Sequence, residues 1–329
     1  MEIKAALRKT HVQIIILLVL LVAFVLLERG DSTLRSFAGI VGLAFVAVFV
    51  GFVALEIKEG ANSHGWKHEI VDTILALGFA LALWFGAQLV LNTSVPISAV
   101  VSCSMLENLN RGDFVIVQGT GIKAYEISME STELAALKKG ITTVEYNGTK
   151  KEVHGSIYSY CIAHYFDDMC KEFVKYPEQF NETIGPFKYN YEKCTMKIRD
   201  SASVQEPCMI SVEFKGNIYY TNFSHDTIVY QPPKTEYFSL FGDIVHRAYF
   251  KIDVNGEKYY LTKGDNNPIL DLMVYSSAYK MGNTPIPEKN QKGRVLLKIP
   301  FLGYAKLLIA GQLTEPDQCK QLLSYQHTS

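Results

Sequence analysis

The chain has 329 residues, with 32 basic and 33 acidic side chains and a formal net charge of −1. This balance excludes the class of nucleic-acid-binding proteins that depends on a basic surplus. The length suggests two structural units, yet long apolar runs fill the first 95 residues and all six cysteines follow them. A uniform soluble globule is therefore excluded.

Three apolar runs predict membrane helices. Residues 12–27 contain Gln13 as their only polar side chain, residues 37–55 contain no charged or amide side chain, and residues 74–91 are interrupted only by Gln88. Runs of this kind can cross a bilayer, and in hydrocarbon their backbone hydrogen bonds must be satisfied within a helix. We therefore expect an α-helical membrane anchor of three spanning helices over residues 1–95.

The first run has a second interpretation, a cleaved signal peptide. Lys4, Arg8 and Lys9 precede it, as basic residues precede the apolar part of such peptides. However, Glu28 and Arg29 follow the run where a cleavage site of small residues would be needed. We therefore favour a retained membrane helix.

The distribution of Lys and Arg in the short loops predicts the orientation. The N-terminal segment and the loop between the second and third runs hold five such residues, whereas the first loop holds two, Arg29 and Arg35. This predicts a multi-pass protein of the cell membrane with a cytoplasmic N-terminus and everything after residue 91 outside. The six cysteines agree with an oxidising compartment. Glycosylation triplets, which also fit an outer location, start at Asn92, Asn147, Asn181 and Asn222.

The outer part reads mainly as β-structure. Residues 96–118 predict a strand, a turn and a second strand. Between residues 120 and 235 we expect a short helix over 132–139 that ends at Gly140, hairpins that turn at residues 147–148 and 215–217, and a helix over 158–175.

Four cysteines of this stretch are close enough in sequence to form disulfides, with the connectivity left open. They are Cys161, Cys170, Cys194 and Cys208. A metal site built from Cys161, His164 and Cys170 is the less favoured alternative. Cys103 could be a reactive thiol, but a buried, inert cysteine is the favoured interpretation.

A hairpin with a two-residue turn follows. Residues 248–254 and 257–263 flank Asn255-Gly256, a pair that favours a primed turn. If the turn sets the register throughout, Phe250 lies opposite Leu261, and His246 lies opposite Asp265 on the same face. A β-bulge anywhere in these strands would shift the pairing.

Serine, histidine and aspartate residues in this outer part suggest nucleophilic catalysis. A serine hydroxyl such as that of Ser104 is a poor nucleophile and needs an adjacent base. A histidine, with a pKa of ~6.5, suits that role near neutral pH, and a carboxylate can fix its tautomer. Each residue alone is more often structural, so the combination carries the hypothesis.

Four blocks in this order resemble type I signal peptidases of the archaeal and endoplasmic-reticulum class: PISAVVSCSMLENLNRGDFVIV (96–117), GDIVHR (242–247), TKGDNNPILD (262–271) and GRVLLKIPFLGY (293–304). The resemblance implies a mainly-β signal-peptidase-type catalytic core made of residues 96–119 and 236–329. Residues 120–235 would then be an inserted, cysteine-containing α+β subdomain. The implied activity is cleavage of signal peptides from translocated precursor proteins after small residues.

The same resemblance implies a role for each matching residue. Ser104 matches the nucleophile and His246 the base. Asp271 is the expected partner of His246 and Asp265 the alternative, whereas the hairpin register favours Asp265. Ser102 matches a position whose hydroxyl can join the Ser104 backbone N–H in an oxyanion hole, a donor worth ~3 kcal/mol of transition-state stabilisation.

Two departures from the family pattern support a rival hypothesis. Glu107 stands where the family usually has proline, and Ser104 and His246 are further apart in sequence than in compact members. The rival is a catalytically silent homologue, or an accessory membrane protein that binds partners through residues 120–235.

The expected partners are the signal peptides of secretory precursors and membrane lipid, with the translocation machinery left open and no nucleic acid. No cofactor and no metal ion are expected. Because all the parts occur in one chain, we expect an archaeal cell membrane rather than the endoplasmic reticulum.

Overall fold

The structure is a computed structural model that describes residues 2–28, 32–312 and 314–325. It divides into two compact units. The helical unit comprises Met1–Val101, Arg111–Ile116 and Leu297–Pro316, and the β unit comprises Ser102–Asn110, Val117–Leu296 and Asp317–Ser329. Arg29, which was counted in predicting the orientation, lies outside the described residues.

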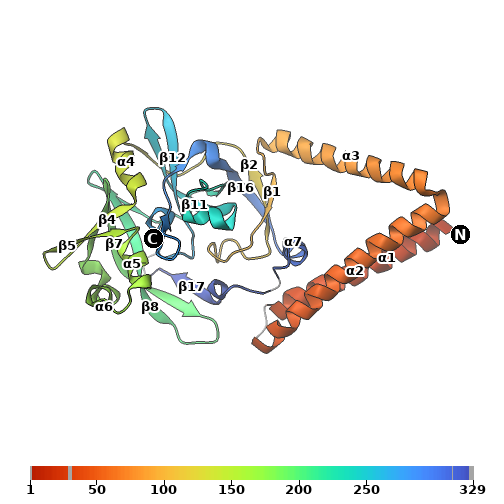
Figure 1. Ribbon diagram of the computed structural model, residues 1–329, viewed down its shortest axis with the longest axis horizontal. Coiled ribbons are helices and arrows are strands. Elements are labelled where there is room, and N and C mark those ends of the chain that lie inside the picture. The colour runs from red at the N-terminus through yellow and green to blue at the C-terminus, as the bar shows by residue number, and fades with distance from the viewer. Residues whose placement is uncertain (1, 29–31, 313, 326–329) are drawn as a thin grey trace. The chain divides into compact units, whose positions relative to one another are not determined.

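The helical unit contains three long helices, α1 (Glu2–Glu28), α2 (Ser32–His64) and α3 (Trp66–Leu91) (Figure 1). Two of them are long and apolar enough to cross a membrane, over Phe37–Ser63 with a mean hydropathy of 2.6 and over Trp66–Leu91 with 2.2. The apolar part of α1, His11–Leu27, is shorter. Among the residues that the structure describes there are therefore two candidate spans, and a third span remains a prediction.

A short helix, α7 (Tyr304–Ile309), packs against α1 and α2 within the helical unit. Its buried Tyr304 and Leu307 join Phe24 of α1 and Phe45 of α2 in one apolar cluster. The expected strand, turn and strand are also present, because β1 (Ile97–Ala99) pairs antiparallel with β2 (Phe114–Gln118).

The β unit is mainly β-structure and contains a curled, half-barrel sheet. Within the unit, its strands follow the order β16, β10, β11, β12, β15, and β3 pairs in parallel with β11. The strands are β3 (Tyr125–Ser128), β10 (Thr227–Tyr230), β11 (Ile244–Val254), β12 (Glu257–Lys263), β15 (Ile286–Pro287) and β16 (Gln291–Ile299). A small ladder joins β13 (Tyr275–Ser276) and β14 (Met281–Gly282).

The hairpin of β11 and β12 follows the predicted register only next to its turn. Phe250 lies opposite Leu261 and Ile252 opposite Tyr259, as predicted. A β-bulge between Ala248 and Phe250 then shifts the pairing, so that Arg247 lies opposite Lys263. The prediction that His246 lies opposite Asp265 is therefore wrong, because a bulge adds one residue to one strand.

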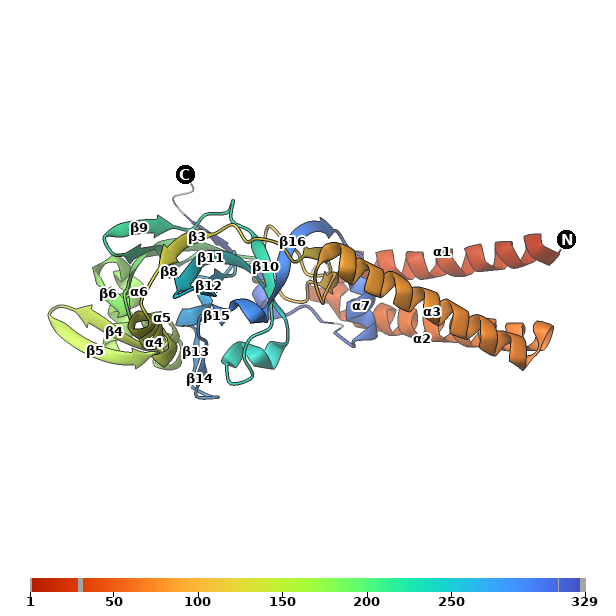
Figure 2. The same ribbon diagram turned by 90° about the horizontal axis from the view of Figure 1, so that it is seen from above.

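A second sheet occupies the other part of the β unit (Figure 2). Its strands are β4 (Ile141–Tyr146), β5 (Thr149–His154), β6 (Asn181–Ile184), β7 (Phe187–Ile198), β8 (Val204–Phe214), β9 (Asn217–Tyr220) and β17 (Gln321–Ser324). Both hairpins expected in this stretch are present, β4 with β5 and β8 with β9. The C-terminal strand β17 pairs antiparallel with β7.

Three helices accompany the second sheet: α4 (Ser131–Lys139), α5 (Ile157–Ala163) and α6 (Asp168–Lys175). The predicted stop at Gly140 is found, where a φ of 62° suits glycine. The single helix expected over 158–175 is instead two helices, because Asp167 begins α6 by accepting a hydrogen bond from the Met169 backbone N–H. The Cys161–Cys170 disulfide joins the two helices.

The two sheets of the β unit share one apolar core. Phe187 of β7 and Phe250 of β11 stack with ring centroids 5.2 Å apart, and both side chains are fully buried. The second sheet takes in only part of residues 120–235. Of the strands in that stretch, β3 and β10 pair with β11 in the first sheet. The shared core fixes the strands that carry the site described next.

Candidate active site

Ser104 lies in a short irregular loop that both of its neighbours anchor. Cys103 and Met105 are 2% and 1% exposed, whereas Ser104 between them is partly exposed. Cys103 is buried as expected, and it forms a disulfide with Cys319 that the sequence analysis did not predict. The alternation leaves the Ser104 hydroxyl accessible while its backbone is held.

The structure brings Ser104, His246 and Asp271 together. The Ser104 hydroxyl lies 2.8 Å from Nε2 of His246, and Nδ1 of His246 lies 2.6 Å from Oδ2 of Asp271. A carboxylate only accepts hydrogen bonds, so Nδ1–H donates to Asp271 and Nε2 is free to accept the proton of Ser104. This is the arrangement of a nucleophile, a base and an orienting acid.

The imidazole is held in a buried position on β11. His246 is 5% exposed, and its ring meets that of Phe238 at 78°, with centroids 6.0 Å apart. Together with the bond to Asp271, this edge contact restricts rotation of the ring. The ring therefore presents Nε2 to Ser104 without an added ordering step.

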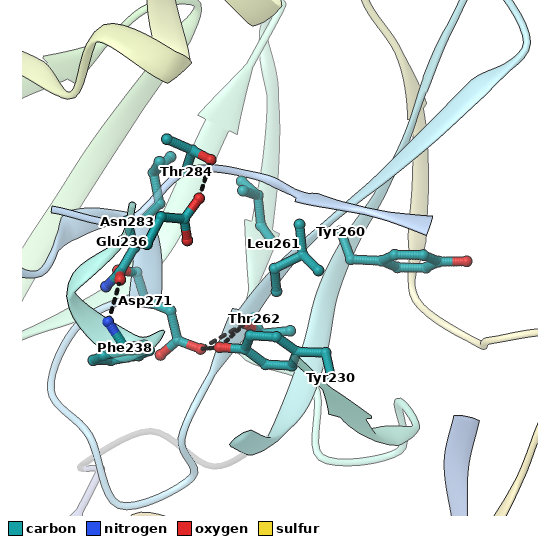
Figure 3. A pocket seen from close by; sticks show the side chains of 11 residues that line it. Tyr230, Glu236, Phe238, Tyr260, Leu261, Thr262, Asp271, Asn283 and Thr284 are labelled. Atoms are coloured by element: carbon teal, nitrogen blue, oxygen red, sulfur yellow. Dashed lines mark hydrogen bonds between the residues drawn. The ribbon is translucent and has the colours of Figure 1, made fainter. Parts of the chain in front are cut away.

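Three polar residues hold Asp271, which is 3% exposed. Tyr230 and Thr262 donate hydroxyl hydrogen bonds of 3.0 and 2.5 Å to Oδ2 (Figure 3), which offset the cost of burying the carboxylate. The Asn283 side-chain amide donates to the Asp271 backbone carbonyl at 2.9 Å. Burial, and then the charge of Asp271, raise the pKa of Tyr230 well above its usual range, so that hydroxyl remains a donor.

Figure 3 also shows Glu236 in the cavity that Asp271 lines. The cavity holds about 10 Å³, which is room for about one water molecule. Burial raises the pKa of Glu236 to about 7, and Thr284 donates a hydrogen bond to this carboxyl group. Oδ1 of Asp271 is buried and has no protein partner in the part of the chain that is described.

Asp265, the other candidate acid, does not contact His246. It accepts two hydrogen bonds from Arg247, at 2.7 and 2.6 Å, and both side chains are buried. The same guanidinium group donates to the backbone carbonyls of Phe223 and His225. Of the two aspartates that the sequence left open, Asp271 therefore meets the histidine, and Asp265 is occupied in a buried ion pair.

Ser102 lies beside the hydroxyl of Ser104, with the two Oγ atoms 3.2 Å apart. It is thus close enough to approach an oxygen that forms on a carbonyl carbon attacked by Ser104. Glu107 is exposed, and the loop closes without a proline there, because the Leu109 backbone N–H donates to the Met105 carbonyl at 2.8 Å.

Sequence reasoning missed the residues that surround Asp271. Thr262 begins the third block and could have been noticed there, but Tyr230, Glu236 and Asn283 lie in segments without a motif. Cys161 and Cys170, for which the sequence left a metal site as the less favoured alternative, form a disulfide. No cluster of three or more potential metal-ligating side chains occurs among the described residues.

Comparisons with known proteins add no family to this picture: no protein-family model matches the chain, and no curated protein matches its sequence. The geometry of Ser104, His246 and Asp271 is therefore the main support for a functional proposal.

Proposed function

We propose that the protein is a membrane-bound serine endopeptidase of the signal peptidase type, which removes signal peptides from translocated precursors after small residues. The observation that carries the proposal is the hydrogen-bonded series from Ser104 through His246 to Asp271, at 2.8 and 2.6 Å. The four sequence blocks that resemble type I signal peptidases suggest the substrate class.

The first half-reaction is acylation. The Ser104 Oγ attacks the scissile carbonyl carbon while Nε2 of His246 takes its proton, and the imidazolium that forms is stabilised by Asp271. The Ser102 hydroxyl and the Ser104 backbone N–H stabilise the oxyanion. When the C–N bond breaks, His246 gives its proton to the leaving amine, and the signal peptide stays on Ser104 as an ester.

The second half-reaction is hydrolysis of that ester. A water molecule attacks the ester carbonyl while His246 accepts one of its protons. The C–O bond to Ser104 then breaks, and His246 returns the proton to Oγ. The products are a free carboxylic acid at the end of the signal peptide and a regenerated Ser104 hydroxyl.

The membrane anchor fits this substrate. A precursor held in the bilayer by its signal peptide is confined to the same plane as the enzyme, which raises the rate of encounter. We propose three spans with the N-terminus in the cytoplasm and the β unit outside, in an archaeal cell membrane. The disulfides of the β unit, such as Cys161–Cys170 and Cys194–Cys208, favour the outer compartment.

A binding function is the rival proposal, and one observation favours it. At α5 and the loop that follows it, Ile162, Tyr165 and Phe166 are 70%, 64% and 74% exposed. Clustered apolar side chains on a surface can mark a contact with another protein. One protein can have both this surface and a catalytic site. The rival proposal is therefore favoured over the enzyme only if the wild-type protein cleaves no precursor.

A cleavage assay separates the two proposals. The full chain is reconstituted in lipid vesicles with a secretory precursor, and the product is followed by gel and mass spectrometry. We expect wild type to release one mature protein and Ser104→Ala to leave the precursor whole, because the variant lacks the hydroxyl that bonds to Nε2 of His246. A wild-type protein that cuts none of a panel of precursors, or a Ser104→Ala variant that cuts as fast, would exclude the enzyme.

A further inference from the structure

The C-terminal segment of the chain reaches the loop that carries Ser104. Cys319, just before β17, forms a disulfide with Cys103, which is the residue immediately before the proposed nucleophile. The two cysteines are 216 positions apart in sequence. A segment outside the four sequence blocks is thus covalently joined to the loop of Ser104.

Asn266 makes a second, non-covalent connection at the same place. Its backbone N–H donates to the Ser104 carbonyl at 2.8 Å, and its side-chain Nδ2 donates to the Cys103 carbonyl at 3.1 Å. One residue therefore binds the two consecutive carbonyl groups on either side of the Ser104 α-carbon and amide.

The Asn266 side chain also binds β17. Nδ2 donates to the Gln321 carbonyl at 2.8 Å, and Oδ1 accepts the Leu323 backbone N–H at 2.7 Å. Both amide protons and the amide oxygen are in use, and the residue is 8% exposed. Only an uncharged amide of this length supplies two donors and one acceptor in these directions.

The strand bound by Asn266 is itself fixed to the second sheet. Leu322 and Leu323 of β17 pair with Lys197 and Met196 of β7. Leu323 is 7% exposed and packs in an apolar cluster with Met196 and the Cys194–Cys208 disulfide. The nucleophile loop is thereby attached to a packed, disulfide-containing part of the fold.

We propose that Asn266 is a positioning residue for Ser104, which fastens the nucleophile loop to strand β17 and so keeps the Ser104 hydroxyl within reach of His246. The inference rests on the proposed peptidase function for its kinetic test, but not for its structural test. Asn266 acts through the backbone of Cys103 and Ser104 and contacts no reacting atom.

Three variants of the full chain test the proposal. Asn266→Ala removes the side-chain bonds. Asn266→Asp keeps the size but turns carboxylate oxygens towards the Cys103 and Gln321 carbonyls. Asn190→Ala is the matched control, because it removes an amide that bonds to Ser211 at 3.0 Å in the second sheet.

The kinetic measurement compares kcat and KM for precursor cleavage. We expect Asn266→Ala to lower kcat by about 10- to 100-fold with KM within about threefold of wild type, since a displaced nucleophile slows chemistry more than binding. Asn266→Asp should lower kcat at least as much, whereas Asn190→Ala should keep wild-type kinetics. If the residue only fills space, Asn266→Asp will match wild type, and the proposal fails.

Hydrogen exchange of the backbone amides provides the structural measurement. Peptides covering residues 100–110 and 319–325 should exchange at least about tenfold faster in Asn266→Ala than in wild type, and not in Asn190→Ala. Unchanged exchange in Asn266→Ala would overturn the inference, whether or not the wild-type protein cuts a precursor. Failure of the wild-type protein to cut any precursor would instead count against the proposed function. If the Asn266→Asp variant is too unstable to purify, the kinetics and hydrogen exchange of Asn266→Ala decide the test.

Discussion

The two aspartates beside His246 and Arg247 illustrate how adjacent residues of one strand create two different sites. His246 points to Ser104 and Asp271, while Arg247 points to Asp265. Both pairs are buried: Arg247 and Asp265 form an ion pair, whereas the neutral imidazole of His246 donates a hydrogen bond to Asp271. One pair orients a proton acceptor, and the other holds the loop that contains residues 264–267.

The first prediction at the residue scale contrasts these two acids. Asp271→Asn should lower kcat by about 10³- to 10⁴-fold, because an amide favours the wrong imidazole tautomer and cannot stabilise the imidazolium. The fold should persist, since Tyr230 and Thr262 can turn their hydroxyls to the new side chain. Cleavage rates and thermal unfolding of the purified protein check both parts.

Asp265→Asn provides the matched comparison. It leaves the Arg247 guanidinium buried without its charge partner, which costs about 3–5 kcal/mol of folding stability. We therefore expect Asp265→Asn to lower the unfolding temperature, whereas the protein that remains folded should keep its cleavage activity. A variant with normal stability but a catalytic defect as large as that of Asp271→Asn would reverse the assigned roles.

Sequence reasoning located most of this site through short blocks. Ser104, His246 and both aspartates stand in blocks that resemble those of type I signal peptidases. The resemblance favoured Asp271, whereas the hairpin register favoured Asp265 and was wrong, because the bulge between Ala248 and Phe250 depends on packing across β11 and β12. Sequence reasoning also missed Tyr230 and Asn283, which approach Asp271 only through long-range folding.

At the scale of single elements, the second sheet carries a buried acid of its own. Glu182 of β6 is fully buried, and its carboxyl group accepts a 2.7 Å hydrogen bond from the Tyr191 hydroxyl. Burial raises the pKa of Glu182 to about 8. The folded protein therefore holds a proton on this residue at neutral pH, whereas the unfolded chain has released it.

This proton predicts how stability changes with pH. Between about pH 5 and pH 8 the folded state binds more protons than the unfolded state, so the contribution of Glu182 destabilises the fold as pH rises. Glu182→Gln should remove a penalty of about 3 kcal/mol at pH 7. Its stability relative to wild type should be higher at pH 8 than at pH 5, as measured by thermal unfolding at both values. An equal difference at the two pH values would contradict this assignment.

Elements formed by neighbouring residues were predictable, whereas elements that depend on distant partners were not. The turns at Asn147-Gly148 and Asn255-Gly256 and the end of α4 at Gly140 follow from local backbone preferences. The parallel pairing of β3 with β11 and the pairing of β17 with β7 join segments far apart in sequence. No local signal encodes such pairs.

At the scale of the whole molecule, an apolar helical unit and a disulfide-containing β unit occur in one chain. Composition predicted the apolar helices, and among the described residues α2 and α3 contain segments long and apolar enough to cross a membrane. The Cys103–Cys319 disulfide could not be predicted from the sequence, since cysteine spacing alone does not determine connectivity. The proposed function joins the two units: the helical unit would hold the protein in a membrane, and the β unit carries the candidate site.

The most direct test of the central claim is to detect an acyl group on Ser104. The full chain is mixed with a precursor, quenched in acid within one turnover and digested, and the peptide that contains Ser104 is examined by mass spectrometry. We expect a mass increase equal to the acylating signal-peptide fragment on Ser104 in wild type, and none in His246→Ala, where the hydroxyl lacks its base. Precursor cleavage with the acyl group on another residue, or undiminished cleavage by Ser104→Ala, would contradict the account.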